Sequence, residues 1–167
     1  MSAKADRAEA LFREGYGCCQ AVAGAFAEEL GLPLETVLRL ASGFSAGFGR
    51  LREVCGAFSG ITMTAGAVWG YGDPADRESK KALYRRVQRL AQELRREHGT
   101  IICRELLARA GVEDDGPAGD PKARTEEYYQ SRPCLGFIRS AAALMERELA
   151  AEGRLGPAAL AKEEKSL

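Results

Sequence analysis

The cysteines are the residues of this 167-residue chain whose chemistry stands out. The chain has five of them: Cys18, Cys19, Cys55, Cys103 and Cys134. None forms a Cys-x-x-Cys pair, and an odd total does not match the even count of a secreted disulfide scaffold. In a reducing compartment, cysteines that do more than pack are metal ligands or redox groups, although any single cysteine is most often a buried packing residue.

Four of the cysteines lie where a helix is predicted to begin. Cys18 and Cys134 open two predicted helices, and Cys55 lies in the first turn of a third. Cys103 closely follows Thr100, a candidate N-cap. The first turn of a helix has unpaired N–H groups and a partial positive charge, so it stabilises a thiolate and lowers the thiol pKa from about 8.5 towards neutrality. We therefore predict four ionisable thiols that can attack disulfides, reduce oxidants or bind a soft metal.

Cys19 is expected to play a different part. Neighbouring positions on a helix point about 100° apart, so adjacent cysteines rarely serve one site. We predict that Cys19 is a small core residue or a spare thiol.

The rest of the chain predicts an all-α fold that positions these cysteines. Ala, Leu, Glu and Arg are abundant, while Val, Ile and Thr are sparse, which favours helix over sheet. Apolar residues recur at helical spacing, and one domain is expected over residues 1–152, with a tail at 153–167 that can add a weakly held helix. Helices are predicted over residues 4–14, 18–30, 53–70, 77–97, 101–110 and 134–151, with another beginning at Pro33.

The predicted helix over residues 53–70 is apolar on nearly all sides, which is typical of the buried centre of a domain. Gly56 and Gly60 lie on one side of this helix. A helix interior with glycines at this spacing allows either close contact with another helix or room for a bound group.

A glycine-rich stretch over residues 42–50 comes before this helix and is predicted to be a loop that turns sharply or allows a close backbone approach. A second loop is predicted over residues 111–123. The candidate cofactor-binding residues are Gly47, Gly49, Arg50 and Gly56, which could cradle a phosphate or a cofactor. This signal is weak without a P-loop lysine or a βαβ frame.

Charge and hydropathy exclude several classes of function. The chain has 24 Lys plus Arg and 24 Asp plus Glu, so it lacks the basic excess of a nucleic-acid-binding protein. The arginines of the helix over residues 77–97 are predicted to form a solvated face. No apolar run approaches the ~20 residues of a membrane span, and no signal peptide is recognisable, so we expect a cytoplasmic protein.

Several stretches of the chain carry a family pattern: residues 15–21, 41–50, 54–60 and 103–107, together with Cys134. They resemble the C_GCAxxG_C_C family of redox-active proteins with four characteristic cysteines, and the Cys55-Gly56-Ala57-x-x-Gly60 motif is the most specific part. The likeness covers roughly residues 7–150 and departs from the usual residues at Gly17 and Cys19. It implies that the characteristic cysteines are Cys18, Cys55, Cys103 and Cys134.

Thiol redox chemistry is the first functional hypothesis. Cysteines that cycle between thiols and disulfides pass electrons through mixed disulfides, as thiol–disulfide oxidoreductases do. Cys18 and Cys55, both beside glycines, are the candidates for the more reactive pair, although four cysteines allow three pairings. The electron-transfer or thiol partner is not identified by the sequence.

Two alternatives stay open. Four thiolates also suit zinc or an iron–sulfur cluster, and His98 could replace one ligand, although structural zinc sites usually have closely spaced ligand pairs. A lone histidine at the end of a charged helix is more typical of a partner for the helix dipole. The other alternative is a helical binding module with structural cysteines. The sequence leaves open zinc, an iron–sulfur cluster or no cofactor, and also assembly into a homo-oligomer.

Overall fold

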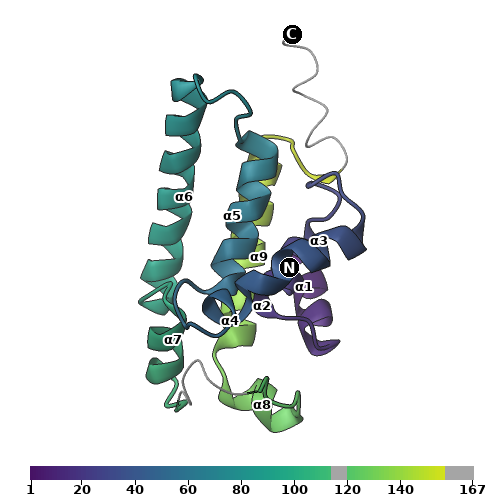
Figure 1. Cartoon of the computed structure of the whole chain (residues 1–167), viewed down its shortest axis with the longest axis vertical. Coiled ribbons are helices and arrows are strands. Elements are labelled where there is room, and N and C mark those ends of the chain that lie inside the picture. Colours follow the sequence, from purple (N-terminus) through teal and green to yellow (C-terminus); the bar gives the residue numbers. More distant parts are fainter. Residues whose placement is uncertain (114–119, 157–167) are drawn as a thin grey trace.

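The computed structural model describes residues 1–113 and 120–156, and within them the chain forms helices and no β-strand (Figure 1). The predicted all-α fold class is therefore confirmed. The helices are α1 (Ala3–Arg13), α2 (Cys18–Ala25), α3 (Leu34–Ala41), the 3-10 helix η1 (Ser42–Phe44), α4 (Ser45–Phe48), α5 (Gly56–Trp69), α6 (Arg77–His98), α7 (Cys103–Arg109), α8 (Glu126–Ser131) and α9 (Cys134–Ala151).

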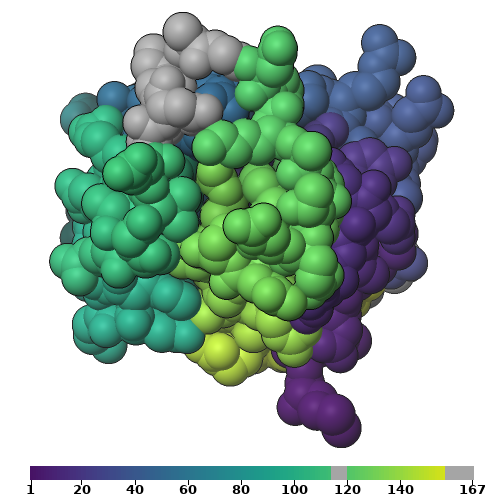
Figure 2. Space-filling view, turned by 90° about the horizontal axis from the view of Figure 1, so that it is seen from below, coloured from purple at the N-terminus to yellow at the C-terminus, as the bar shows by residue number. Residues whose placement is uncertain are grey.

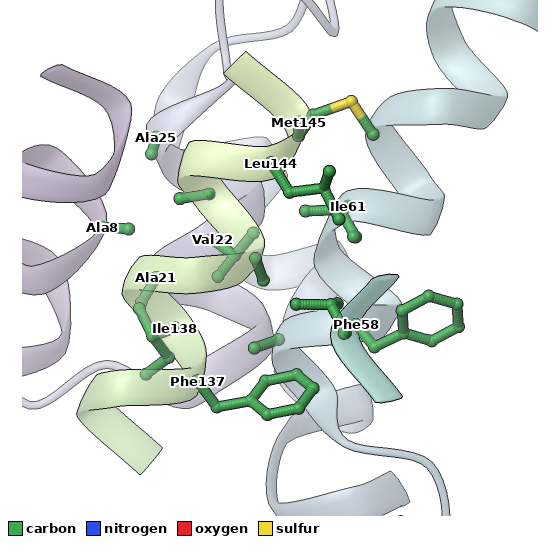
Figure 3. Close-up of a cluster of buried hydrophobic side chains, with 14 of the residues drawn as sticks. Ala8, Ala21, Val22, Ala25, Phe58, Ile61, Phe137, Ile138, Leu144 and Met145 are labelled. Carbon is green, nitrogen blue, oxygen red and sulfur yellow. The ribbon is translucent and has the colours of Figure 1, made fainter. Parts of the chain in front are cut away.

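The core lies where α1, α2, α5 and α9 meet. Figure 3 shows Val22 of α2, Ile61 of α5 and Ile138 of α9 among the side chains that fill it. All three are fully buried, and each such side chain contributes about 1.5–3 kcal/mol relative to an exposed one. The predicted burial of the helix at 53–70 is confirmed, and α2 shares this central position because it contacts α1, α3, α5 and α9.

Glycines of α5 allow α2 to pack at very short range. A Cβ atom at Gly60 would lie 2.9 Å from the Cβ of Val22 and 3.1 Å from the backbone nitrogen of Ala23. A Cβ atom at Gly56 would lie 2.5 Å from the Sγ of Cys18. Of the two expectations for this glycine pair, close helix contact is the one that the structure shows.

Two helix boundaries differ from the prediction. The second helix ends at Ala25 rather than near Leu30, because the chain tightens there: the N–H groups of Phe26 and Ala27 bond to carbonyls three residues back. The central helix begins at Gly56 rather than at residue 53, because Val54 is extended and forms a bridge to Ile102.

Other differences lie outside the core. Helix α8 was not predicted; it begins after Thr125, whose side chain caps it. Only part of the arginine face of α6 is solvated, because Arg86 bonds to Glu148 at 3.1 Å and to Glu152 at 2.6 Å on α9. The helix predicted in the tail and the centre of the 111–123 loop lie outside the described residues. No helix in the described part of the chain has both the length and the apolar character of a membrane span.

Substitution of a glycine tests the close contact between α2 and α5. We expect Gly60→Ala to lower the free energy of unfolding by roughly 1–3 kcal/mol, because the new methyl group overpacks the contact with Val22. The matched control is Gly66→Ala in the same helix, where the added Cβ would meet no described atom within 4 Å apart from its chain neighbours and the backbone of its own helix. This control should raise the free energy of unfolding by about 0.5–1 kcal/mol. Denaturant unfolding followed by circular dichroism measures both, and equal effects would contradict the close contact.

Candidate cysteine site

Each of the four predicted cysteines lies at the beginning of a helix. Cys18, Cys103 and Cys134 are the first residues of α2, α7 and α9, and Cys55 is the N-cap of α5. The predicted positions are confirmed. In Figure 1, α4, α7 and the start of α9 gather at the lower end of the molecule.

One cavity joins these four cysteines. Its volume is about 70 Å³, and the side chains of Cys18, Cys55, Cys103 and Cys134 all line it. The fold therefore brings sulfur atoms from four separate segments into one neighbourhood. Cys19 is not among the lining residues: it is fully buried, and its Sγ lies 3.8 Å from the Sδ of Met63. Burial raises the pKa of Cys19 well above its ordinary value, so its expected role as a core residue agrees with the structure.

An extended segment before α5 holds two of the cysteines side by side. The backbone N–H of Cys55 donates to the carbonyl of Ile101 at 2.8 Å, and the N–H of Cys103 donates to the carbonyl of Glu53 at 2.6 Å. These bonds flank the bridge between Val54 and Ile102. They use backbone donors at the starts of α5 and α7 and so fix the two helix ends relative to each other.

The glycine-rich stretch does turn sharply, as predicted, and it does so with left-handed backbone. Ala46, Gly47, Phe48, Gly49 and Arg50 all have positive φ angles, and the N–H of Gly49 closes the turn on the carbonyl of Ser45 at 3.0 Å. Left-handed conformation costs about 1–2 kcal/mol for each residue with a Cβ. Glycine at two of the five positions lowers this cost, and backbone strain of this kind concentrates at functional sites.

This turn contacts the cysteines directly. The backbone N–H of Ala46 donates to the Sγ of Cys18 at 3.4 Å. A Cβ atom at Gly47 would lie 2.8 Å from the Cβ of Cys103. The close approaches at Gly47 and Gly56 are therefore made by the protein's own atoms. The cofactor-binding role of Gly47, Gly49, Arg50 and Gly56 stays a prediction.

Cys18 is the thiolate of the cluster, with a pKa lowered to about 6. The largest cause is the hydrogen bond from the Cys55 thiol, and burial opposes it. The backbone N–H groups of Ala46 and Cys19 and the charge of Arg124 lower the pKa further. Donors that point at the sulfur favour the charged form, so Cys18 is mainly ionised at neutral pH.

The prediction that all four thiols have lowered pKa values is wrong for Cys55 and Cys134. The pKa of Cys55 is raised because its S–H is held as the donor to Cys18 and because it is buried. Burial, followed by the charges of Cys18 and Cys103, raises the pKa of Cys134 to about 12. The partial charge of a helix N-terminus is weaker than desolvation and a nearby negative sulfur, so a second thiolate is disfavoured.

Arginines lie beside the cavity at positions that the sequence pattern did not single out. Arg52, Arg124 and Arg132 line the same cavity as the cysteines. The guanidinium groups of Arg124 and Arg132 lie 4.6 and 4.7 Å from the ring centre of Tyr128, at distances typical of cation–π contacts. Figure 2 shows segment 120–135, the part of the chain to which Arg124, Tyr128 and Arg132 belong, at the centre of the lower face between α1 and the region of α6 and α7.

The proposed metal ligands do not form a metal-binding arrangement in the structure. Within residues 1–113 and 120–156, no three His, Cys, Asp or Glu side chains are placed to hold one ion. His98 is the last residue of α6, and its ring packs 4.7 Å from that of Phe137. The geometry therefore gives no support to the zinc or iron–sulfur alternative.

The chain belongs to the C_GCAxxG_C_C family. Residues 16–148 match the family model, whose description is "Putative redox-active protein (C_GCAxxG_C_C)". No match was found among curated proteins or among solved structures. The matched region contains all four cysteines of the cavity, so the resemblance predicted from the sequence is confirmed at the level of the family.

The thiol alkylation rate tests the assignment of the thiolate. We expect Cys18 to be the fastest cysteine to react with iodoacetamide, with a rate that rises around pH 6. Cys55→Ala should raise the pKa of Cys18, because the strongest donor to its sulfur is lost. Cys134→Ala is the matched control, since the Cys134 thiol is not among the causes of the Cys18 shift. An unchanged pH profile in Cys55→Ala would contradict the hydrogen bond.

The same shift predicts how stability depends on pH. The pKa of Cys18 is lower in the folded state, so between about pH 6 and 9 the unfolded chain binds more protons at this site. The stabilisation from Cys18 therefore grows with rising pH in this window, with a limiting slope of about 1.4 kcal/mol per pH unit, and it is lost as the pH falls through 6. Urea unfolding at several pH values gives the free energy of unfolding as a function of pH. In Cys18→Ser this free energy should rise less steeply with pH than in the natural protein. Identical slopes in the two proteins would argue against a folded-state thiolate.

Proposed function

We propose that the protein is a thiol–disulfide redox protein in which Cys18 is the attacking thiolate and Cys55 is the resolving thiol. The observation that carries this proposal is the cavity that Cys18 and Cys55 line together, in which hydrogen bonding by the Cys55 side chain is the largest cause of the lowered pKa of Cys18. The two thiols interact and their pKa values shift in opposite directions, which suits an attacking thiolate followed by a resolving thiol.

In the first step, the Cys18 thiolate attacks one sulfur of a substrate disulfide. A new S–S bond forms between Cys18 and that sulfur while the substrate S–S bond breaks. The other half of the substrate leaves as a thiolate, which takes a proton from water. A mixed disulfide on Cys18 is the product, and no electrons have left the protein–substrate pair.

In the second step, Cys55 loses its proton and its thiolate attacks the Cys18 sulfur. The Cys18–Cys55 disulfide forms, and the second half of the substrate leaves as a thiolate that is protonated in water. Over both steps the substrate disulfide gains two electrons and two protons. The two cysteines supply both electrons. Because Cys18 begins as a thiolate, Cys55 gives up one proton to solvent and water supplies the balance. A dithiol of the cell is the reductant that restores both thiols.

The pKa pattern suits this order of events. While Cys18 is ionised, the Cys55 thiol is held protonated as its donor, and the charge of Cys18 disfavours a second thiolate. Once Cys18 is part of a mixed disulfide, its negative charge is gone. The two contributions that Cys18 makes to the raised pKa of Cys55 then disappear, so Cys55 ionises more readily when its attack is needed.

Trapping the mixed disulfide tests this function. We expect reduced protein treated with hydroxyethyl disulfide to form the Cys18–Cys55 disulfide. Cys55→Ser should stop at a mixed disulfide on Cys18, because the resolving thiol is absent. Peptide mapping by mass spectrometry identifies both products, and Cys19→Ala is the control that should behave like the natural protein, since Cys19 does not line the cavity.

Two outcomes would overturn the proposal. One is a mixed disulfide on Cys103 or Cys134 while Cys18 stays free. The other is one equivalent of zinc or iron in anaerobically purified protein that is lost in Cys55→Ser, which would favour the metal-binding alternative.

A further inference from the structure

A groove lined by cations opens beside the cysteine cavity. Its volume is about 380 Å³, and none of its described lining residues is Asp or Glu. We call it the cationic groove because of its five basic side chains: Arg50, Arg52, Lys122, Arg124 and Arg132. The chain as a whole has equal numbers of acidic and basic residues, so basic side chains are locally concentrated along this groove.

The cationic groove is continuous with the cysteine cavity. Ser45, Ala46, Arg52, Arg124 and Arg132 line both. Ala46 marks the junction, because its backbone N–H donates to the Sγ of Cys18. If one end of a molecule contacts Cys18 in the cavity, the rest of that molecule therefore extends into the cationic groove, beside the basic side chains.

Two polar atoms on the shared wall have no hydrogen-bond partner among residues 1–113 and 120–156. They are Arg124 Nη1 and Ser45 Oγ, and both atoms are buried. The guanidinium of Arg124 is otherwise held in place: it bonds to the carbonyl of Tyr16 at 3.4 Å and lies 4.8 Å from the ring centre of Phe12. Because an arginine nitrogen can only donate, a ligand group beside Nη1 has to be an acceptor, and a carboxylate can bind a guanidinium through two parallel hydrogen bonds.

We propose that the substrate of Cys18 is a small disulfide that carries carboxylates, with its S–S bond in the cysteine cavity and its carboxylates in the cationic groove. This inference rests on the proposed function and adds the substrate class. A small molecule is favoured over a disulfide on a protein surface because a cavity of about 70 Å³ admits only a narrow group. The exchange steps are those given above, with the carboxylate-bearing thiols as the reduced products.

Three disulfides of different charge test the proposal on the reduced, full-length protein. They are oxidised glutathione, which carries carboxylates, the neutral hydroxyethyl disulfide, and the cationic cystamine. Each rate constant with Cys18 is divided by the rate constant with free cysteine, which removes the intrinsic reactivity of the reagent. We expect oxidised glutathione to be favoured over hydroxyethyl disulfide by about tenfold or more, with cystamine slowest. The preference should shrink as salt is added.

Substitutions in the cationic groove test whether its arginines cause the preference for oxidised glutathione. Arg124→Gln and Arg132→Gln should each reduce the preference for oxidised glutathione severalfold. A change in the reactivity of Cys18 itself affects all three disulfides alike and so cancels in the ratio. Arg96→Gln, on the exposed surface of α6, removes the same charge elsewhere and should leave the ratio unchanged.

A second comparison uses only the natural protein, so it does not depend on whether a variant folds. Iodoacetate and iodoacetamide differ in charge but are similar in size, so their rate ratio at Cys18 in the natural protein reports the local preference for an anion. We expect this ratio to exceed that of free cysteine. Equal normalised rates for the three disulfides, or a ratio insensitive to salt and to both groove variants, would overturn the inference while leaving the proposed function intact. Failure of Cys18 to react with any disulfide would instead overturn the proposed function.

Discussion

The site depends on one physical requirement: a negative charge on the Cys18 sulfur has to be stabilised away from bulk water. Desolvation alone would raise the pKa of this thiol, as it does for Cys19 next to it in the chain. Cys18 differs because donors point at its sulfur, chiefly the Cys55 thiol and the N–H of Ala46. The rest of the structure can be understood as the framework that holds these donors in place.

That framework includes a segment of left-handed backbone and a close helix approach at a glycine. The left-handed turn at residues 46–50 is unfavourable on its own, yet it brings the Ala46 N–H to the sulfur. Gly56 lets α5 approach Cys18 closely, and the bridge between Val54 and Ile102 aligns the start of α5 with that of α7. Packing of α2 against α1, α5 and α9 supplies the stability that offsets this strain.

Local signals were enough to predict much of the fold. The helices α1, α3, α6 and α9 were predicted within a few residues because their apolar spacing and their caps are local properties. The placement of the cysteines at helix starts follows from the same signals. Helix α8 was missed because its short sequence has no buried residue and hence no clear apolar stripe. The early end of α2 was missed because tertiary contacts override a periodic pattern.

The sequence by itself determined the helical fold class, the family and the positions of the four cysteines on their helices. Only the tertiary structure decided which thiol is ionised, because a pKa depends on donors, burial and charges that come from distant segments. Cys18 and Cys134 both begin a helix, yet the pKa of one is lowered and that of the other is raised. The arginines of the cationic groove likewise meet beside Cys18 only after residues 50–52 and 122–132 fold together. A helix terminus is encoded locally, whereas the electrostatic field at a sulfur atom is a sum over the whole fold.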